Sequence, residues 1–231
     1  MGSMRIRTIL LALVAAFAMS AVASATASAA LSLLPQLVNK EGKELVTKLF
    51  KGKSGASTFE TKSGESVKCT ADAITGQITG LSTDTAEIDF TGCSAASGLL
   101  KCKSKGAATA GLILLNVNSL LVWLNDTGLA GEDDILPTDL TIECSGLASE
   151  TLLVKGSTLC PTTTALSKKA TITCKQTKGV QEYTEYLMLE GPKVKDITET
   201  EGKGTKVFAF EQSGLTGTDE IEFDEEVLII T

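Results

Sequence analysis

The chain has 231 residues, with 21 lysines and arginines against 28 aspartates and glutamates, no histidine, and a formal net charge of −7. Without histidine, the chain has no Ser-His-Asp or Cys-His catalytic site and no histidine metal ligand. An acidic chain whose only arginines are Arg5 and Arg7 is also a poor partner for a phosphate backbone, so we expect no nucleic-acid partner.

The first 29 residues predict a secretory signal peptide. Arg5 and Arg7 give it a positive start, the apolar run "TILLALVAAFAMSAVA" follows, and "SATASAA" offers small-residue cleavage sites. Removal of residues 1–29 leaves 19 lysines against 28 acids, a formal charge of −9. No later stretch has the roughly eighteen apolar residues that a membrane helix needs. The sequence therefore predicts a secreted or cell-surface protein that does not insert into a membrane after cleavage.

Residues 30–55 predict an N-terminal segment with a short helix. Its apolar residues recur at the spacing of one helix face; they are Leu34, Leu37, Val38, Leu45 and Leu49. Gly52 and Gly55 are expected to end the helix, and Gly42 weakens it. Such a segment either packs on the body of the protein or docks on a partner.

Residues 56–231 predict one disulfide-stabilised β domain. Apolar and polar residues alternate in "SVKC", "TAEIDF", "LTIEC", "KATITC", "TKVFAF" and "EIEF", which is the pattern of strands with one buried and one wet face. "GLILLNVNSLLVWL" is apolar on both phases and predicts two buried strands joined by a turn, with Trp123 in the core. Many short strands with glycine-containing turns are typical of an antiparallel β-sandwich or a barrel-like fold. The fold class is therefore mainly β.

Six cysteines follow the signal peptide, and an even number in an exported chain predicts three disulfides. They are Cys69, Cys93, Cys102, Cys144, Cys160 and Cys174. No C-x-x-C pair is present, so a structural metal site is poorly supported. Cys69, Cys144 and Cys174 fall on the apolar phase of their strands and are expected to point inward. Proximity favours Cys93 with Cys102, then Cys160 with Cys174, which leaves Cys69 with Cys144.

The acidic residues suggest two kinds of site, a calcium site and a pair of catalytic carboxylates. Calcium prefers a cluster of oxygen ligands, and the weak candidates are Asp126, Asp133 and Asp134 in "NDTGLAGEDD". This stretch lacks the spacing of a calcium loop, so no metal or other cofactor is predicted. Paired carboxylates such as Glu220 and Glu222 could hydrolyse a glycoside, but neighbouring acids are common in an acidic strand.

The carboxyl-terminal stretch "EEVLIIT" predicts an apolar strand at a free end. It either completes the domain or adds to the sheet edge of a neighbouring subunit, which would give a homo-oligomer or a surface layer. The sequence as a whole thus favours a non-catalytic exported protein of the cell surface or extracellular matrix that acts by binding or self-assembly. The alternatives are a secreted carboxylate-based hydrolase and a β-sandwich that binds a small ligand.

Several stretches between residues 56 and 160 resemble a group of functionally uncharacterised exported proteins of soil-type actinobacteria. The stretches that carry the resemblance are "FETKSGESVKCT", "GQITG", "IDFTGC", "CKSKG", "LVWL", "IECSG" and "VKGS". The resemblance implies an extracellular β fold with disulfides. It implies no activity, ligand or catalytic residue.

Overall fold

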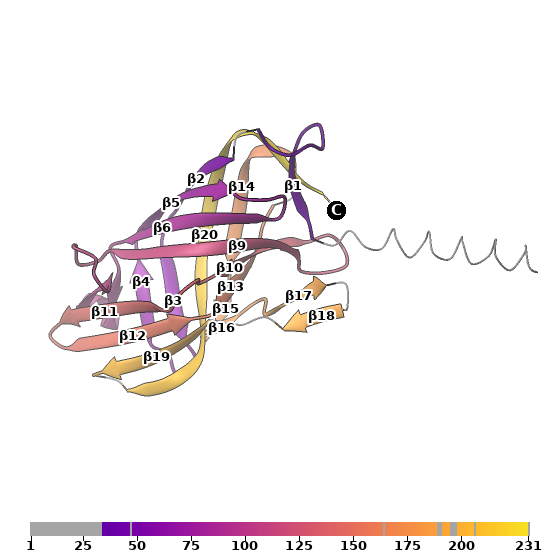
Figure 1. Cartoon of the computed structure of the whole chain (residues 1–231). Coiled ribbons are helices and arrows are strands. Elements are labelled where there is room, and N and C mark those ends of the chain that lie inside the picture. Colours follow the sequence, from indigo (N-terminus) through magenta and orange to yellow (C-terminus); the bar gives the residue numbers. More distant parts are fainter. Residues whose placement is uncertain are drawn as a thin grey trace, which may run out of the picture. The chain divides into compact units, whose positions relative to one another are not determined.

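One strand, β20 (Phe208–Ile230), runs the length of the β structure and belongs to two rings of strands (Figure 1). The computed structural model describes residues 34–46, 48–163, 165–188, 191–194, 198–205 and 207–230. The predicted signal peptide, residues 1–29, lies outside the described residues. Within the described ranges, none of the helical structure is long and apolar enough to cross a membrane.

Ring A is closed by antiparallel pairing all the way round. It consists of β2 (Leu49–Ser54), β5 (Ala71–Ile78), β6 (Thr83–Thr91), β9 (Ile113–Trp123), β10 (Ala130–Ile135), β13 (Ser157–Pro161), β14 (Ser167–Cys174) and residues 217–223 of β20. The seam between β13 and β14 is the thinnest: it rests on a bridge between Thr162 and Ile172 and on a 3.1 Å hydrogen bond from the Thr163 amide to the Thr171 carbonyl.

Ring B closes in the same way around the other half of β20. It consists of β3 (Ser57–Thr61), β4 (Ser66–Cys69), β7 (Ser94–Ala95), β8 (Leu100–Ser104), β11 (Leu140–Gly146), β12 (Ser149–Lys155), β19 (Glu199–Gly204) and residues 208–216 of β20. A single-turn 3₁₀ segment, η1 (Ala96–Gly98), lies between β7 and β8.

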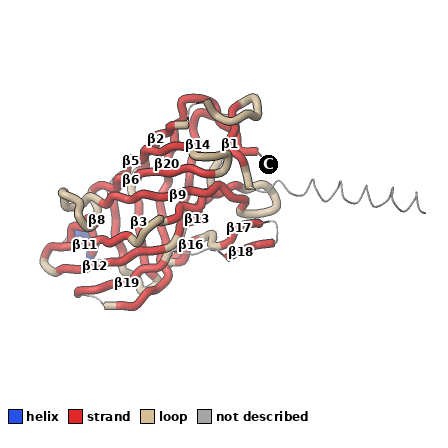
Figure 2. Tube along the Cα trace, in the orientation of Figure 1, coloured by secondary structure: helices blue, strands red, loops and turns tan. Residues whose placement is uncertain are grey.

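The two rings are the two halves of one long up-and-down barrel, because most strands of ring A continue along the chain into strands of ring B. The composite strands are, in chain order, β2–β3, β4–β5, β6–β7, β8–β9, β10–β11, β12–β13, β14–β19 and β20. Each is paired with the next in the described ladders, and β20 pairs with the first. Figure 2 shows that strands make up most of the described chain. The barrel-like prediction is therefore confirmed, and a sandwich with open edges is not what forms. Full closure leaves the two rings without a free edge in the described pairings.

The seventh composite strand carries an insertion between its halves β14 and β19. The insertion holds two hairpins, β15 (Gln176–Thr177) with β16 (Val180–Gln181), and β17 (Glu185–Met188) with β18 (Gly191–Val194). The β17 backbone pairs with the end of β9 at Leu187 and Trp123, and Tyr186 packs on the outer wall against Val122 and Leu159.

The register around ring A sets the width of the barrel. Paired residues can be followed round the ring from Asp219 in both directions. One path runs through Ser54, Asp72 and Phe90 to Ile113. The other path runs through Ile172, Thr162 and Ala130 to Trp123. Both paths end on β9, at Ile113 and Trp123, so the stagger is ten residues. An eight-stranded barrel of this kind has an interior just wide enough for side chains or one small ligand.

Inward-facing apolar residues fill each ring as a separate core. The ring A core is centred on residues such as Ile74, Ile88 and Ile221, and the ring B core on Val67, Ile142 and others. Phe90 and Leu136 pack against both cores. The predicted apolar phase faces inward in "SVKC", "TAEIDF", "LTIEC", "KATITC" and "EIEF". In "TKVFAF" it does so at Phe208 but not at Phe210, which is 37% exposed.

Three disulfides join neighbouring composite strands: Cys69–Cys93, Cys102–Cys144 and Cys160–Cys174. The Cys160–Cys174 prediction is confirmed, whereas Cys93–Cys102 and Cys69–Cys144 are wrong. The backbones of Cys93 and Cys102 do meet, because the Cys102 amide donates to the Cys93 carbonyl at 3.0 Å. Cys102 nevertheless faces Cys144 directly across the β8–β11 ladder, with their Cα atoms 4.0 Å apart. The register of the strands, and not the distance along the sequence, therefore decides which cysteine Cys102 bonds. All six cysteines are buried, so the predicted inward direction of Cys69, Cys144 and Cys174 is confirmed.

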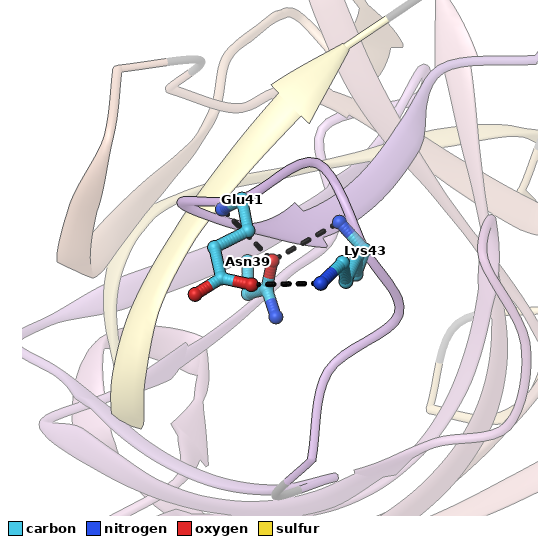
Figure 3. Close-up of polar contacts among 3 residues, drawn as sticks. All are labelled: Asn39, Glu41 and Lys43. Atoms are coloured by element: carbon cyan, nitrogen blue, oxygen red, sulfur yellow. Dashed lines mark hydrogen bonds and ion pairs between the residues drawn. The ribbon is translucent and has the colours of Figure 1, made fainter.

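The helix predicted in residues 30–55 is wrong for the part of that segment that the structure describes. Residues Gln36–Asn39 form strand β1, which pairs with the end of β20, and β2 belongs to ring A. Between them, the Asn39 Oδ1 atom accepts hydrogen bonds from the amides of Glu41 and Lys43, at 2.9 and 3.0 Å (Figure 3). Gly42 has a φ of 72°, which L-residues rarely adopt, so this short turn interrupts the helical spacing. Leu45 then enters the ring A core.

"GLILLNVNSLLVWL" also departs from expectation, because it forms the single long strand β9 and has no turn at Asn116–Ser119. Its inner residues enter the barrel, while Leu120 and Val122 are covered from outside by the insertion. Trp123 lies at the end of this strand, half-buried, and not in the middle of the core.

Two glycines allow phenylalanine rings to lie across the strand next to them. Gly76 is paired with Phe50, and Gly202 with Phe208, and a Cβ atom at either glycine would overlap the ring. We expect Gly76→Ala to destabilise the protein by about 1–3 kcal/mol, because the added methyl overpacks the core. Gly55→Ala is the matched control, since nothing lies within 4 Å of its Cβ position. Urea unfolding of both variants checks this, and equal stability of the two would contradict the packing.

Candidate functional site

An internal cavity of about 100 Å³ lies where the two cores meet. Apolar side chains from both rings form most of its wall, including Ile88, Phe90, Ile113 and Val117 from ring A and Phe59, Val67, Ile142 and Val154 from ring B. Polar groups interrupt this wall at a few points, mainly Asp134, Thr158, Thr198 and Asp219. A largely apolar cavity with a few converging polar groups is the usual form of a small-ligand site.

Two rows of three polar residues cross the inner wall of ring A. In the first row, Ser54 of β2 stands between Asp219 of β20 and Asp72 of β5. In the second, Ser119 of β9 stands between Asp84 of β6 and Asp134 of β10. Directly opposite residues of antiparallel strands have Cβ atoms about 5 Å apart. Each row therefore holds two carboxyls around one hydroxyl.

Serine hydroxyls bond one carboxyl in each row. The Ser119 Oγ atom donates to Asp134 Oδ1 at 2.8 Å, and Ser54 Oγ donates to Asp72 Oδ2. Glu132 lies two residues before Asp134, on the same face of β10. Asp134 and Asp219 line the cavity between the cores, whereas Asp84 and Glu132 line a smaller cavity of about 50 Å³ deeper in ring A.

Burial raises the pKa of these carboxyls. It is the main reason that the pKa of Asp219 rises to about 7, and the nearby charge of Asp72 is the second reason. Burial also raises the pKa of Asp134 to about 7, against the lowering effect of the hydrogen bond from Ser119, and it raises the pKa of Asp84 to about 6. The pKa values of Glu132 and Asp72 are raised by burial too. Every lysine whose exposure the structure describes lies at least partly in solvent, so no described ammonium group is buried against these acids.

The wall of the barrel is interrupted beside this cavity. The β9–β10 ladder ends at Asn118 and Ile135, and the β8–β11 ladder begins at Ser104 and Ile142. A cleft of about 520 Å³ occupies the gap, and three of its lining residues also line the internal cavity. These are Leu115, Leu136 and Leu140. Three leucine side chains thus separate the cavity from the outside.

The weak calcium candidates do not converge. Asp126 is exposed in the turn after β9, and Asp133 and Asp134 point to opposite faces of β10. Asp134 faces the cavity, whereas Asp133 is buried on the outer face between Leu120 and Leu159. Among the described residues, no three His, Cys, Asp or Glu side chains are grouped so as to hold a metal ion.

The predicted hydrolase pair also lies away from the cavity. Glu220 and Glu222 are exposed on the outer face of β20, opposite Lys53 and Lys51 of β2. The carboxyl that enters the barrel from this strand is their neighbour Asp219.

Sequence reasoning missed Asp72, Asp84, Glu132 and Asp219 as site residues. The sequence did carry a signal, because these acids lie on the same strand face as buried apolar residues. Asp219 shares its face with Ile221 and Phe223, and Asp84 shares its face with Ile88. An acid on the apolar phase of a strand must either be buried or disrupt the strand. The overall excess of acids hid this signal.

The raised pKa values predict a protein that is more stable in mild acid than in mild alkali. Below about pH 4, the carboxyls are protonated in both folded and unfolded chains, and their contribution to stability is complete. Between pH 4 and about 7, the unfolded chain ionises first, so stability falls as pH rises through the folded pKa values. We expect the free energy of unfolding to be smaller at pH 8 than at pH 5, by on the order of 1–3 kcal/mol per carboxyl.

Urea unfolding of the oxidised protein between pH 4.5 and 8.5 measures this slope. Asp219→Asn should flatten the slope, because an amide does not ionise. Glu220→Gln, which changes the adjacent but exposed acid, should leave the slope unchanged. A wild-type protein that gains stability between pH 5 and 8 would show that these carboxyls are ionised and well solvated in the fold.

No protein-family model, no curated protein and no solved structure matches the chain significantly. A functional assignment therefore rests on the geometry of this site.

Proposed function

We propose that the protein is an exported, non-catalytic binding protein that holds a small ligand of largely apolar character inside its barrel. The observation that carries the proposal is the internal cavity between the two cores, separated by three leucines from an outer cleft. The predicted signal peptide and the three disulfides, which are typical of oxidising compartments, support a place outside the cell or on its surface. The resemblance to exported actinobacterial proteins agrees with this location.

Binding is favoured over hydrolysis by the position of the carboxyls. They do converge and their pKa values are raised, as acid catalysis requires. They face narrow spaces of about 50 and 100 Å³, however, which leave no room for a sugar chain or a peptide. A group held in such a space can be bound, but a polymer cannot pass through it.

Binding is also favoured over self-assembly through the carboxyl-terminal strand. Residues 227–230 of β20 pair with β1 on one side, and Val227 pairs with Ser167 on the other. In the described pairings this strand is therefore engaged within its own chain, as a strand that completes the domain would be. The amino-terminal segment is likewise engaged, because Leu45 is part of the ring A core.

Methyl NMR with isobutanol as the probe tests the proposal. We expect saturable shifts of the cavity methyl groups of Ile88, Ile113 and Val117, and no comparable shifts of exposed methyls such as Leu147. Val117→Phe should abolish the shifts, because the larger side chain fills the cavity. Val207→Phe is the control, since Val207 is 79% exposed and a larger side chain there leaves the cavity unchanged.

Absence of saturable shifts at the cavity methyls, or equal effects of the two phenylalanine variants, would refute ligand binding in the barrel. Leu215→Phe fills the cavity from the β20 side. It replaces Val117→Phe if that variant does not fold.

A further inference from the structure

We propose that the ligand of the barrel carries a positive charge, and that a small alkylammonium group sits in the cavity between Asp134 and Asp219. This inference rests on the proposed function and adds the chemical class of the ligand. It follows from the charges and from the hydrogen-bonding groups of the cavity wall.

Among the described residues that line the cavity, there are acidic groups and no basic one. Asp134 and Asp219 are its charged residues, they come from different strands, and they share the same enclosed space. The two carboxyls also influence each other, since the charge of Asp219 raises the pKa of Asp134. An ionised carboxyl in an apolar cavity is costly unless a cation accompanies it. None of the lysines whose exposure the structure describes is buried, so none of these brings an ammonium group to this space.

The hydroxyl protons of Thr198, Thr158 and Ser119, near the carboxyls, are already donated to other protein atoms. Thr198 Oγ1 donates to the Ser157 carbonyl at 2.8 Å and lies 2.9 Å from Thr158 Oγ1. Because a hydroxyl has one proton, Thr158 must be the donor in the second bond. Thr158, which stands directly opposite Asp134, is then left with lone pairs only. The proton of Ser119 is likewise committed to Asp134.

When Asp134 and Asp219 are ionised, acceptors therefore exceed donors on this part of the inner wall. Asp134, Asp219 and Thr158 all offer acceptors to the cavity, and Ser57 is a further hydroxyl in its wall. Behind them, the Oδ1 atoms of Asp72 and Asp84 are buried and accept no hydrogen bond in the described structure. Asp72 is only 6% exposed. A ligand that supplies several donors and a positive charge complements such a wall, and an ammonium group has three donors and no acceptor.

The size of the cavity limits the rest of the ligand. A cavity of about 150 Å³ accommodates benzene, so the space of about 100 Å³ here suits a branched alkyl group of about four carbons. The aliphatic lining, which includes Leu115 and Val117, suits the alkyl part. A fatty acid or another anion would place a second negative charge beside the two carboxyls and is disfavoured.

Three probes with nearly the same shape separate charge from shape: isobutylammonium, isobutanol and isobutyrate. Binding of each to the wild-type protein is measured by methyl NMR at pH 8, where Asp134 and Asp219 are mostly ionised. We expect isobutylammonium to bind at least tenfold more tightly than isobutanol, and isobutyrate to bind more weakly than either. Asp134→Asn and Asp219→Asn should each weaken isobutylammonium about tenfold and leave isobutanol within twofold. Glu220→Gln should change none of the three.

The outcomes distinguish this inference from the function on which it rests. If isobutanol binds as tightly as isobutylammonium, or if the asparagine variants weaken both equally, the cationic ligand class is overturned and small-ligand binding stands. If none of the probes gives saturable shifts at the cavity methyls, the proposed function itself fails. The comparison of the three probes on the wild-type protein decides the question even where an asparagine variant does not fold.

Discussion

The closure of the hydrogen-bond ladder through β20 is the constraint on which the rest of the structure depends. This strand has 23 residues and pairs with β3 and β19 in one half and with β2 and β14 in the other. A closed ladder fixes which residues point inward on all of its strands, because side chains alternate along each strand. A polar residue on the inward phase then has no route to solvent other than a break in the wall.

The two rows of carboxyls follow from that constraint. Asp219 and Asp72 are inward because Ile221 and Ile74 are inward, and a one-residue slip of either strand would expose its part of the core. The protein thus holds acids in a low-dielectric space by the strength of the surrounding ladder. Serine hydroxyls at Ser54 and Ser119 offset part of the cost of burying them. The remaining unfavourable energy would be relieved by the proposed ligand of opposite charge, so we expect stability and binding to be linked at this site.

The local alternation of apolar and polar residues was sufficient to predict a mainly β fold, but not to predict that its strands close into a barrel. The period-two alternation correctly indicated strands, and the inward phase of Cys69, Cys144 and Cys174 was readable from their apolar neighbours. The pairing of Cys102 with Cys144 depends on the register between β8 and β11, strands that are far apart in sequence, so spacing alone favoured a wrong partner. The helical spacing of residues 34–49 arose from two short strands and a turn organised by Asn39. The cavity depends on the meeting of two cores and has no local signature.

The order of the disulfides along the chain has a consequence for biosynthesis. The bonds close loops of 24, 42 and 14 residues, and each loop ends before the next begins. A chain that crosses a membrane from its amino end and is oxidised as it emerges would therefore acquire the native bonds by joining each new cysteine pair in turn. A fully reduced chain that refolds all at once must instead choose among fifteen arrangements. The connectivity suits a protein assembled during export, with β20 emerging last and closing the barrel over bonds that are already in place.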